Sequence, residues 1–427
     1  MNYRIFPPDG WIEATVRLPL SKSMSARALV INALAGMPLS MDGMAGCDDT
    51  RAIFQGLQAR DGETVNVGQA GTAMRFLTAY YAAMPGREVK IDGDERMRQR
   101  PIGPLVEALR ATGADIDYIG SEGYAPLKIR GRKLEGGDVT MDASVSSQFV
   151  SAIMMVAPLM TEGLKITLRG EIVSLPYIKL TMKMMEQAGA DADFYGGDTV
   201  EIRPAAYEPT QFDIQPDWSA ASPWYEVAAL SGGEIAVENL PEDSHQPDRE
   251  AAAIFDRLGV ATDFHPEEGD SPLLMAHPDA DARLDHDFSP NPDLVQAAAV
   301  TCCMLGMPFH FTGLSTLSIK ECDRVEALVK EMAKVGAMLE RPAAGELLWD
   351  GRRRPITELP RFATYGDHRM AMALAPVSIL MPGIVVEDVE TVTKSYPAFW
   401  DELQNAGFTL LDGDAPLPVQ EDEDAES

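Results

Sequence analysis

LRATGADI, residues 109–116, joins the end of an amphipathic helical run to the start of a short strand through Gly113. Glycine is the expected residue just past a helix end, where the backbone φ angle is positive. The same pattern returns in four later segments: MEQAGADADF (185–194), FDRLGVATDF (255–264), MAKVGAMLE (332–340) and LQNAGFTLL (403–411). The five glycines are separated by 76, 70, 77 and 71 residues. This near-constant spacing indicates a repeated unit of helix, glycine and strand.

Gly62, in FQGLQARDGETVNV (54–67), is placed to close a shortened first copy of the unit. Six copies of about 70 residues account for nearly all of the 427-residue chain. That length also exceeds the usual size of one core, so two domains are the default expectation. The sequence therefore predicts an α/β protein with a six-fold repeat. The alternative that stays open is that helix–glycine–strand junctions occur in any α/β protein.

Composition limits the classes of function. Apolar residues make up 45% of the chain, enough for sizeable cores. The longest runs that are nearly free of polar residues, 149–160 and 370–381, have 12 residues each. A membrane span needs about 18, so both runs predict buried helices. The formal net charge of −30 argues against nucleic acid as a partner, because phosphate contacts need clustered Lys and Arg. We expect the acidic run 420–427 to be a solvated tail.

The sequence also bears on the compartment. The N-terminal MNYRIFPPDG lacks the basic and apolar regions of an export signal. The four cysteines show neither metal-site spacing nor a disulfide framework: Cys47, Cys302, Cys303 and Cys322. We therefore expect a cytoplasmic protein without a metal.

Several apolar helical runs follow short polar segments rich in Ser, Asp or Gly, and most of these segments carry a cation. They are SKSMSAR (21–27), GQAGTAMR (68–75), SVSSQ (144–148), KECDR (320–324) and YGDHR (365–369). Ser and Asp cap helix N-termini, and such ends attract anions through their free N–H groups and partial positive charge. For any single segment, capping alone is a sufficient explanation. Cations at so many of these starts, in so acidic a chain, favour an anion-binding site.

Some of these segments indicate chemistry. Ser23 and Arg27 lie one helical turn apart and share a face. In GDERMRQRP (93–101), arginines 96, 98 and 100 alternate, so only part of that run should touch a ligand. Glu321 lies among cations, which suits general acid/base work. Neither a nucleophile elbow nor a Walker loop is present. These residues predict a cofactor-free site for a ligand with several anionic groups, without identifying it.

Taken in order, the motifs resemble those of the 5-enolpyruvylshikimate-3-phosphate synthase family, from about residue 17 to residue 410. The matching segments are LPLSKSMSARAL (18–29), QAGTAMR (69–75), GDERMRQRPIGPLVEAL (93–109), VSSQF (145–149), SLPYI (174–178), PDWSAASPWY (216–225), NPDLVQ (291–296), IKECDR (319–324), YGDHRMAM (365–372) and TKSYPAFW (393–400). The resemblance implies transfer of the enolpyruvyl group of phosphoenolpyruvate to the 5-hydroxyl of shikimate 3-phosphate, with release of phosphate and without a cofactor.

The resemblance also implies a fold. It has two similar domains, each of three βαβαββ units with helices packed inward as an inside-out α/β barrel, six repeats in all. Residues 1–18 and 217–427 are expected to form a discontinuous domain that carries the acid/base groups and the ligands of the phosphoenolpyruvate carboxylate. Residues 19–216 are expected to form an inserted domain that carries most ligands of shikimate 3-phosphate. The implied protein is a monomer that binds these two small molecules and neither nucleic acid nor a membrane.

Site residues follow from the resemblance motif by motif. Those implied for shikimate 3-phosphate are Lys22, Ser23, Arg27, Ser146, Ser147, Gln148, Ser174, Tyr177, Asp293 and Lys320. Those implied for phosphoenolpyruvate are Lys22, Gly71, Thr72, Arg96, Gln148, Arg324, Arg369 and Lys394, with Arg96, Gln148 and Lys394 on its phosphate and the two later arginines on its carboxylate. Three residues are implied as catalytic. Glu321 protonates the methylene carbon, and Asp293 or Lys22 takes the proton of the 5-hydroxyl.

The chain departs from the family pattern at Leu20, Ala26, Gln69, Phe76 and Cys322. None of these changes removes a proton-transfer group or a cation, although they leave affinities and the response to the inhibitor glyphosate open.

Two other functions compete with the one implied. One is the sister transferase that acts on UDP-N-acetylglucosamine, which carries an Asn after the early Lys and a reactive Cys in a mobile loop. Ser23 follows Lys22 here, and no Cys lies near residue 96. The other is an inactive anion-binding relative, against which the retained Asp293, Glu321 and Lys394 argue.

Overall fold

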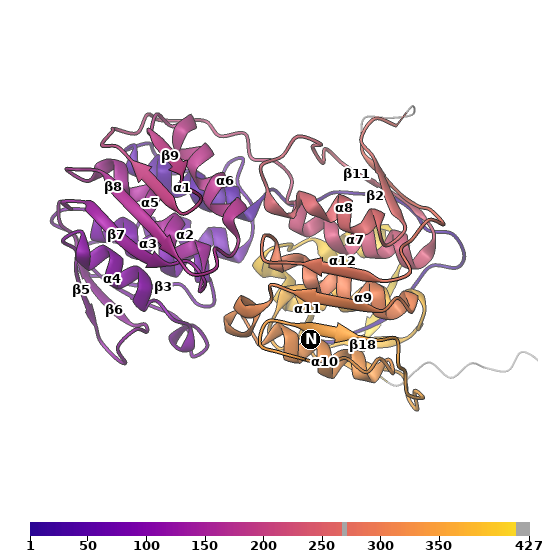
Figure 1. The fold of residues 1–427 in the computed structure, drawn as a ribbon. Coiled ribbons are helices and arrows are strands. Elements are labelled where there is room, and N and C mark those ends of the chain that lie inside the picture. The colour runs from indigo at the N-terminus through magenta and orange to yellow at the C-terminus, as the bar shows by residue number, and fades with distance from the viewer. Residues whose placement is uncertain (267–270, 416–427) are drawn as a thin grey trace, which may run out of the picture.

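The computed structural model describes residues 1–266 and 271–415, which fold into two lobes lying side by side (Figure 1). Two separate groups of buried apolar side chains form the cores of these lobes. One group comes from residues 5–18 and 218–408, and the other comes from residues 26–214. The N-terminal segment therefore packs with the second half of the chain. The expected acidic tail at 420–427 lies outside the described residues.

Five small mixed sheets share one arrangement, in which a parallel pair of strands is extended by antiparallel neighbours. The lobe of residues 26–214 holds β3-β4-β6-β5 (Thr64–Asn66, Glu88–Asp92, Leu127–Arg130, Asp115–Tyr118) and β7-β8-β10-β9 (Gly137–Asp142, Leu164–Arg169, Thr199–Ile202, Ala192–Tyr195). The other lobe holds β12-β13-β11-β2 (Val260–Asp263, Leu273–Ala276, Glu234–Val237, Glu13–Val16), β14-β15-β16 (Leu284–Asp287, Phe309–Thr312, Leu347–Trp349) and β17-β18-β1-β19 (Arg361–Phe362, Ile384–Val386, Tyr3–Phe6, Thr409–Asp412). The structure thus confirms a mixed α/β fold made of repeated units.

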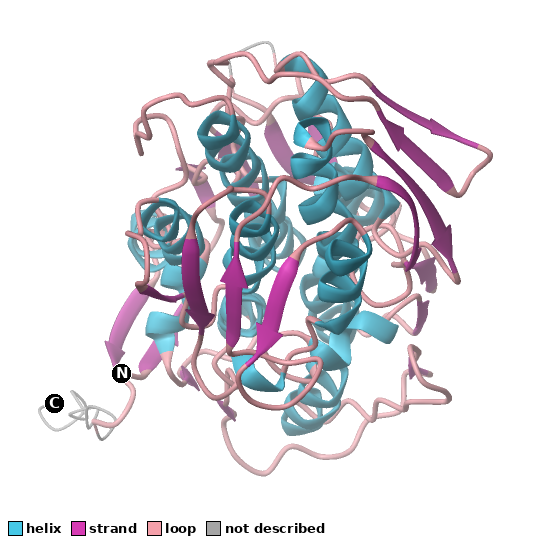
Figure 2. Ribbon diagram, turned by 90° about the vertical axis from the view of Figure 1, so that its left-hand side faces the viewer, coloured by secondary structure: helices cyan, strands magenta, loops and turns pink. Residues whose placement is uncertain are grey.

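Helices occupy the interior of each lobe, with strands around them (Figure 2). The first lobe contains α1 (Lys22–Leu34), α2 (Asp48–Leu57), α3 (Gly71–Ala82), α4 (Gly103–Ala111), α5 (Ser147–Val156) and α6 (Leu175–Gln187). The second contains α7 (Trp218–Ser231), α8 (Ala251–Asp256), α9 (Val295–Leu305), α10 (Arg324–Lys334), α11 (His368–Leu374) and α12 (Phe399–Asn405). Two parallel strands need a crossover, and α3, α5, α9 and α11 each supply one. Nearly every residue of these four helices is buried, because they are apolar on all sides.

Both runs that predicted buried helices lie in this interior. Residues 149–156 belong to α5 and residues 370–374 to α11, and both helices continue as short 3-10 turns at Ala157–Leu159 and Ala375–Ile379. Pro158 and Pro376 lie in the first residues of these turns, and proline favours the change because it lacks the N–H of an α-helical hydrogen bond. None of the helices in the two described ranges has the length and apolar character that crossing a bilayer demands.

The predicted glycines occupy the predicted conformation. Gly113, Gly189, Gly259, Gly336 and Gly407 have φ angles between +84° and +100°, and each follows a helix by two or three residues. The first copy is shorter than the others. It contains α1 and α2, and Gly62 has a φ of +79°, but no strand is assigned to residues 21–63, all of which the structure describes. The copy that contains Gly336 is incomplete as well: its sheet has three strands, and the segment expected to form a strand after Gly336 makes only isolated bridges at Ala337 and Glu340.

The chain passes between the lobes twice, and the two passages are hydrogen-bonded to each other. The N–H of Ser21 donates to the carbonyl of Gln215 at 2.7 Å, and the N–H of Asp217 donates to the carbonyl of Pro19 at 2.9 Å. Leu20 and Pro216 form an antiparallel bridge between these two bonds. The lobes are thus joined through one short, two-stranded connection.

One buried acid in the second lobe has no evident partner. Glu226, in α7, is fully buried, and neither of its side-chain oxygens has a hydrogen-bond partner in the part of the chain that the structure describes. Burial raises the pKa of Glu226 well above its ordinary value of 4.5. The folded state therefore holds a proton that the unfolded chain releases above about pH 4.5. Stability falls as the pH rises through this window, by about 1.4 kcal/mol per pH unit at most.

We expect Glu226→Gln to remove this dependence, because the amide keeps the shape and stays neutral. The free energy of unfolding of the variant, minus that of the parent, should grow by more than about 1 kcal/mol between pH 5 and pH 8. Urea denaturation at both pH values measures it. Glu186→Gln, on the exposed side of α6, is the control and should show no such change. An equal difference at the two pH values would contradict the assignment.

Candidate active site

A pocket lies between the lobes and is lined by side chains from both. Its cations are Lys22, Arg27, Arg75, Arg100, Lys320, Arg324 and Arg369, and its carboxylates are Asp49, Asp217, Asp293 and Glu321. Cations outnumber acids here, whereas the whole chain carries a formal charge of −30. A local excess of positive charge in so acidic a protein is suited to an anionic ligand.

Helix N-termini open onto this pocket. Ser21, Ser146 and Asp367 cap α1, α5 and α11, and their side chains accept hydrogen bonds from backbone N–H groups of the first turn. Ser174 precedes α6 in a left-handed conformation, with a φ of 55°. Helix α3 starts at Gly71 with no side-chain cap. The free N–H groups and dipoles of these helices add to the positive potential of the side chains.

Arg27 and Arg75 are buried cations without a carboxylate partner among the described residues. The guanidinium of Arg27 donates to the Thr181 hydroxyl at 2.7 Å and to the Ser23 carbonyl at 2.9 Å. That of Arg75 donates to the Gly71 carbonyl at 2.8 Å. Burial lowers the pKa of Arg27 to about 10, and burial together with the nearby Arg100 lowers the pKa of Arg75 well below its ordinary value. A guanidinium keeps its charge in proteins, so a bound anion would relieve the unpaired charge of both groups.

The remaining cations are paired with acids. Arg324, which is 1% exposed, contacts Asp293 and Asp367 at 2.7 Å and Glu321 at 3.1 Å. Arg369 contacts the other oxygen of Asp293 at 2.9 Å. These guanidinium groups can each hold a carboxylate in a bidentate manner. Asp293 contacts both of these guanidinium groups, one through each of its carboxylate oxygens.

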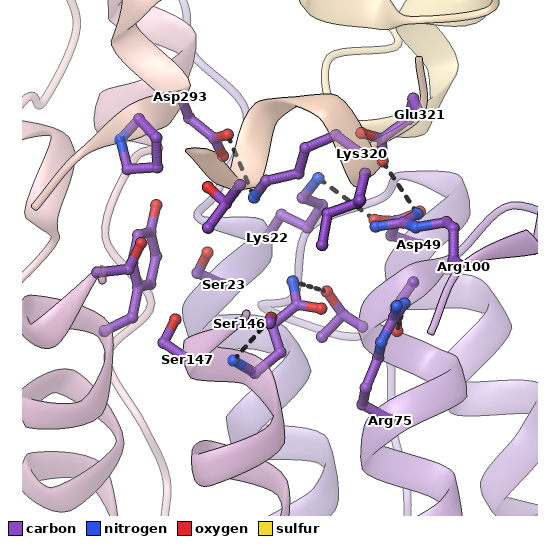
Figure 3. A pocket seen from close by; sticks show the side chains of 18 of the residues that line it. Lys22, Ser23, Asp49, Arg75, Arg100, Ser146, Ser147, Asp293, Lys320 and Glu321 are labelled. Atoms are coloured by element: carbon purple, nitrogen blue, oxygen red, sulfur yellow. Dashed lines mark hydrogen bonds and ion pairs between the residues drawn. The ribbon is translucent and has the colours of Figure 1, made fainter. Parts of the chain in front are cut away.

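A chain of alternating charges joins the lobes at the pocket, and Figure 3 shows three of its members, Lys22, Asp49 and Glu321. Lys22 contacts Asp49 at 3.3 Å, Asp49 contacts Lys394 at 3.4 Å, and Lys394 contacts Glu321 at 3.3 Å. Burial lowers the pKa of Lys22, but the combined attraction of the neighbouring acidic groups, Asp49 foremost and Glu321 among them, leaves that pKa raised. Lys22 therefore carries its charge at neutral pH.

The two central acids are ionised in this state. Burial alone would raise the pKa of Glu321, but Lys394, Arg100 and Arg324 outweigh it and hold the pKa well below 4.5. Burial likewise opposes ionisation of Asp293, and Arg369, Lys320 and Arg324 hold the pKa of that acid well below 3.8. Ligand anions that bind these cations would raise the pKa values of Glu321 and Asp293, because they would neutralise the positive charges that stabilise the ionised acids.

Polar uncharged groups line the floor of the pocket. The N–H of Gln148 donates to the Ser146 hydroxyl at 3.2 Å, and its side-chain amide donates to the Thr72 hydroxyl at 3.2 Å. Tyr177 faces the cavity from α6, and its hydroxyl lies 3.5 Å from Asp248 of the other lobe. Asp248 also accepts a bond from Ser219, and burial raises the pKa of Asp248 to about 6.

The structure brings nearly all the predicted site residues to this pocket. Those that line it are Lys22, Ser23, Arg27, Gly71, Thr72, Ser146, Ser147, Gln148, Ser174, Tyr177, Asp293, Lys320, Glu321, Arg324 and Arg369. Lys394 lies just behind the lining, against Glu321. Within the described ranges, no group of three or more His, Cys, Asp or Glu side chains is arranged to hold a metal ion.

Arg96 is not among the lining residues, and Arg100 is. The expectation that arginines 96, 98 and 100 alternate along an extended segment is wrong, because Met97–Gln99 form a 3-10 turn. The three side chains consequently point in different directions. Arg96 donates to two backbone carbonyls of the other lobe, Arg98 pairs with Asp92, and Arg100 lies 3.5 Å from Glu321.

Sequence reasoning also missed Arg75, Asp49 and His368 as pocket residues. Arg75 lies in GQAGTAMR (68–75) and His368 in YGDHR (365–369). Their positions at helix starts are the signal by which the sequence could have placed them in the pocket. Asp49 lies in the first turn of α2, where an acid ordinarily serves the helix dipole. Burial lowers the pKa of His368 well below 6.5, so its ring is neutral, and neither ring nitrogen has a hydrogen-bond partner among the described residues.

Comparison with known proteins agrees with this geometry. Residues 56–403 match the family model of EPSP synthase (3-phosphoshikimate 1-carboxyvinyltransferase). A 3-phosphoshikimate 1-carboxyvinyltransferase of Bacteroides fragilis is 45% identical over 415 residues, which cover 97% of this chain and 100% of the relative. One of Vibrio cholerae is 33% identical, over 92% of this chain and 97% of the relative.

Among solved structures, EPSP synthase from Acinetobacter baumannii superposes with a TM-score of 0.72 at 19% identity, over 96% of this chain and 100% of that one. At that identity the likeness bears on the fold alone. The match of the family model over most of the chain, the identity to the Bacteroides fragilis enzyme over nearly its whole length, and the cation-rich pocket between two lobes agree. The chain belongs to the EPSP synthase (3-phosphoshikimate 1-carboxyvinyltransferase) family.

Proposed function

We propose that this enzyme transfers the enolpyruvyl group of phosphoenolpyruvate to the 5-hydroxyl of shikimate 3-phosphate and releases phosphate, a step of the shikimate pathway toward chorismate. The observation that supports it best is the pair of buried guanidinium groups, Arg27 and Arg75, that have no carboxylate partner in the described residues. They line the same pocket as Arg324 and Arg369, whose ion pairs with internal acids could be exchanged for pairs with a substrate. A site for two highly anionic substrates requires such cations.

Shikimate 3-phosphate fits the side of the pocket formed by the first lobe. We assign its 3-phosphate to the hydroxyls of Ser146, Ser147 and Ser174, beside the N-terminus of α5, where phosphate is favoured. Ser23 and Arg27 lie next to them and suit the ring hydroxyls and carboxylate. The same assignment places Gln148, Tyr177 and Lys320 around the ring.

Phosphoenolpyruvate fits between the lobes. We assign its carboxylate to Arg324 and Arg369, which would exchange their internal acids for it. Lys394, Gln148 and Arg100 suit its phosphate, and Arg100 takes the place that the resemblance gave to Arg96. Gly71 and Thr72 complete this part of the pocket, and Lys22 lies at the junction of both substrates.

Proton transfer becomes possible when substrate anions replace the protein's own acids at these cations. Once substrate anions claim Arg100, Lys394 and Arg324, the pKa of Glu321 rises, so the acid can protonate the methylene carbon. Positive character develops at the adjacent carbon, and the 5-oxygen attacks it while Asp293 or Lys22 takes the hydroxyl proton. In the tetrahedral adduct the carbon–oxygen bond to phosphate then breaks, and Glu321 or a neighbour removes a methyl proton. The surrounding cations stabilise the departing phosphate.

The two lobes provide the means of assembling this site. We propose that they are domains, an inserted one of residues 19–216 and a discontinuous one of residues 1–18 and 217–427, each of three βαβαββ units around inward-facing helices. The hydrogen-bonded connection at residues 19–21 and 215–217 would be the hinge. We propose further that the enzyme acts as a monomer in the cytoplasm, as the resemblance implies.

Activity with two acceptors tests the function. With phosphoenolpyruvate present, shikimate 3-phosphate should support continuous phosphate release in a coupled assay, and UDP-N-acetylglucosamine should not. Release with the nucleotide sugar would indicate the sister reaction, and release with neither would indicate an inactive relative.

Glu321→Gln should lower kcat by roughly a hundredfold to ten-thousandfold while both substrates still bind, because it removes the acid and preserves the shape. Phosphate release gives the rate, and calorimetric titration gives the affinities. Glu326→Gln is the matched control, because Glu326 lies on the solvent-facing side of α10 and pairs with Lys330. Unimpaired turnover in Glu321→Gln would refute its role as the acid.

Gly71→Ala should weaken inhibition by glyphosate, which carries a phosphonate and a carboxylate and is longer than phosphoenolpyruvate. A methyl group at residue 71 would lie 2.6 Å from a guanidinium nitrogen of Arg75 and 2.8 Å from two of Arg100, so these groups must shift. We expect the inhibition constant to rise roughly tenfold to a hundredfold and the KM for phosphoenolpyruvate to rise less.

Gly46→Ala is the control for this experiment, because a methyl group at residue 46 has no atom within 4 Å. Steady-state inhibition against varied phosphoenolpyruvate measures both constants. Equal inhibition of the parent and of Gly71→Ala would show that residue 71 does not border the subsite.

A further inference from the structure

Arg96 reaches from the first lobe to the main chain of the second. It immediately precedes the 3-10 turn Met97–Gln99, between β4 and α4. Its Nε donates to the carbonyl of Glu321 at 3.0 Å, and a terminal nitrogen donates to the carbonyl of Lys320 at 2.9 Å. The planar fork of a guanidinium suits two acceptors side by side, which a lysine ammonium cannot match.

These two carbonyls have no other donor among the residues the structure describes, whether backbone or side chain. They belong to residues 320 and 321, which lie between the 3-10 turn Ser315–Ile319 and the start of α10, outside any helix or strand. The backbone that carries the acid Glu321 is therefore held by a side chain of the opposite lobe.

The side chain of Glu321 is held differently. Its oxygens contact Lys394 at 3.3 Å, Arg324 at 3.1 Å and Arg100 at 3.5 Å. The proposed function gives all three cations to phosphoenolpyruvate, so the substrate competes for the contacts that position the carboxylate. Arg96 itself does not line the pocket, so its contacts with the two main-chain carbonyls lie outside the part of the site where the substrate would bind.

We propose that Arg96 is a positioning residue that fixes the main chain at residues 320 and 321 and so keeps Glu321 aimed at the substrate after its ionic partners have been taken. Because the contact spans the two lobes, it forms only when they are together, and it couples their approach to the placement of the acid. The inference rests on the proposed function of the pocket, and it replaces the phosphate-binding role that the resemblance implied for Arg96.

Arg98 offers a matched control. It lies two residues further along the same turn, is more exposed, and makes a bidentate contact with Asp92 of its own lobe, at 2.8 and 2.9 Å. Removing it takes away a cation from the same surface without touching the other lobe.

Arg96→Ala, Arg96→Lys and Arg98→Ala should be compared with the parent by steady-state phosphate release. We expect Arg96→Ala to lower kcat roughly tenfold to a hundredfold, since a small displacement of a catalytic group has effects of that size. The KM for phosphoenolpyruvate should change less than about threefold, because Arg96 does not touch it. Arg96→Lys should recover only part of the rate, guanidinium ion added to Arg96→Ala should restore some of it, and Arg98→Ala should stay within about twofold.

A double-mutant cycle tests the route of the effect. If Arg96 acts through Glu321, Arg96→Ala should have little further effect in the Glu321→Gln background. A raised KM with unchanged kcat would overturn the inference in favour of direct phosphate binding, and unchanged kinetics or full additivity would overturn it outright. If Arg96→Ala does not fold, the kcat of Arg96→Lys and its cycle with Glu321→Gln decide the question. An inactive parent would refute the proposed function instead.

Discussion

The contact of one buried guanidinium with three carboxylates is the interaction on which the pocket depends. Arg324 holds Asp293, Glu321 and Asp367 together, although the three acids come from separate segments of the second lobe. Removing one partner from a buried charge cluster leaves uncompensated charge, at a cost of about 3–5 kcal/mol. The cluster therefore fixes the relative positions of η4 (Pro292–Leu294), α10 and α11 at the cavity. Asp367 also caps α11 and is fully buried, so its place in the cluster is fixed by the helix start as well as by Arg324.

The electrostatics of the pocket differ from those of the chain as a whole. A net charge of −30 repels anionic ligands at long range. At physiological ionic strength the screening length is about 8 Å, so surface acids on the far sides of the lobes contribute little at the cavity. The nearby cations and helix N-termini then dominate. The fold concentrates these features because residues at the N-termini of helices from both lobes line the same pocket.

The repeat could be predicted from the sequence because it depends on a local pattern, whereas most individual pocket residues were expected only from the resemblance to a known family. A glycine after a helix has a positive φ for steric reasons that act within a few residues, and the glycines at 113, 189, 259, 336 and 407 all conform. Cations placed at helix starts likewise reveal themselves in short motifs. The contacts of Arg96 could not be found in this way, because they depend on a 3-10 turn and on a carbonyl pair more than 200 residues away.

Two further features could not be predicted from the sequence, because they also depend on contacts between segments that are distant along the chain. Asp49 joins Lys22 and Lys394 only because three distant segments meet, and nothing near residue 49 signals that meeting. Glu226 sits within an apolar helix, where a lone acid normally predicts an exposed position, yet tertiary packing covers it completely. Packing between distant segments determines both the ion pairs of Asp49 and the burial of Glu226.

The pairing of the N-terminal strands has a consequence for how the protein is made. β1, at Tyr3–Phe6, lies between β18 and β19, and β2, at Glu13–Val16, pairs with β11. The first lobe has all its strands once residue 202 has been synthesised, whereas β1 acquires its last neighbour only when residues 409–412 have left the ribosome. Pairings this distant along the chain form slowly. During synthesis β1 therefore stays unpaired beside a folded first lobe until β19 has been made. Throughout that interval its exposed edges can pair with wrong strands.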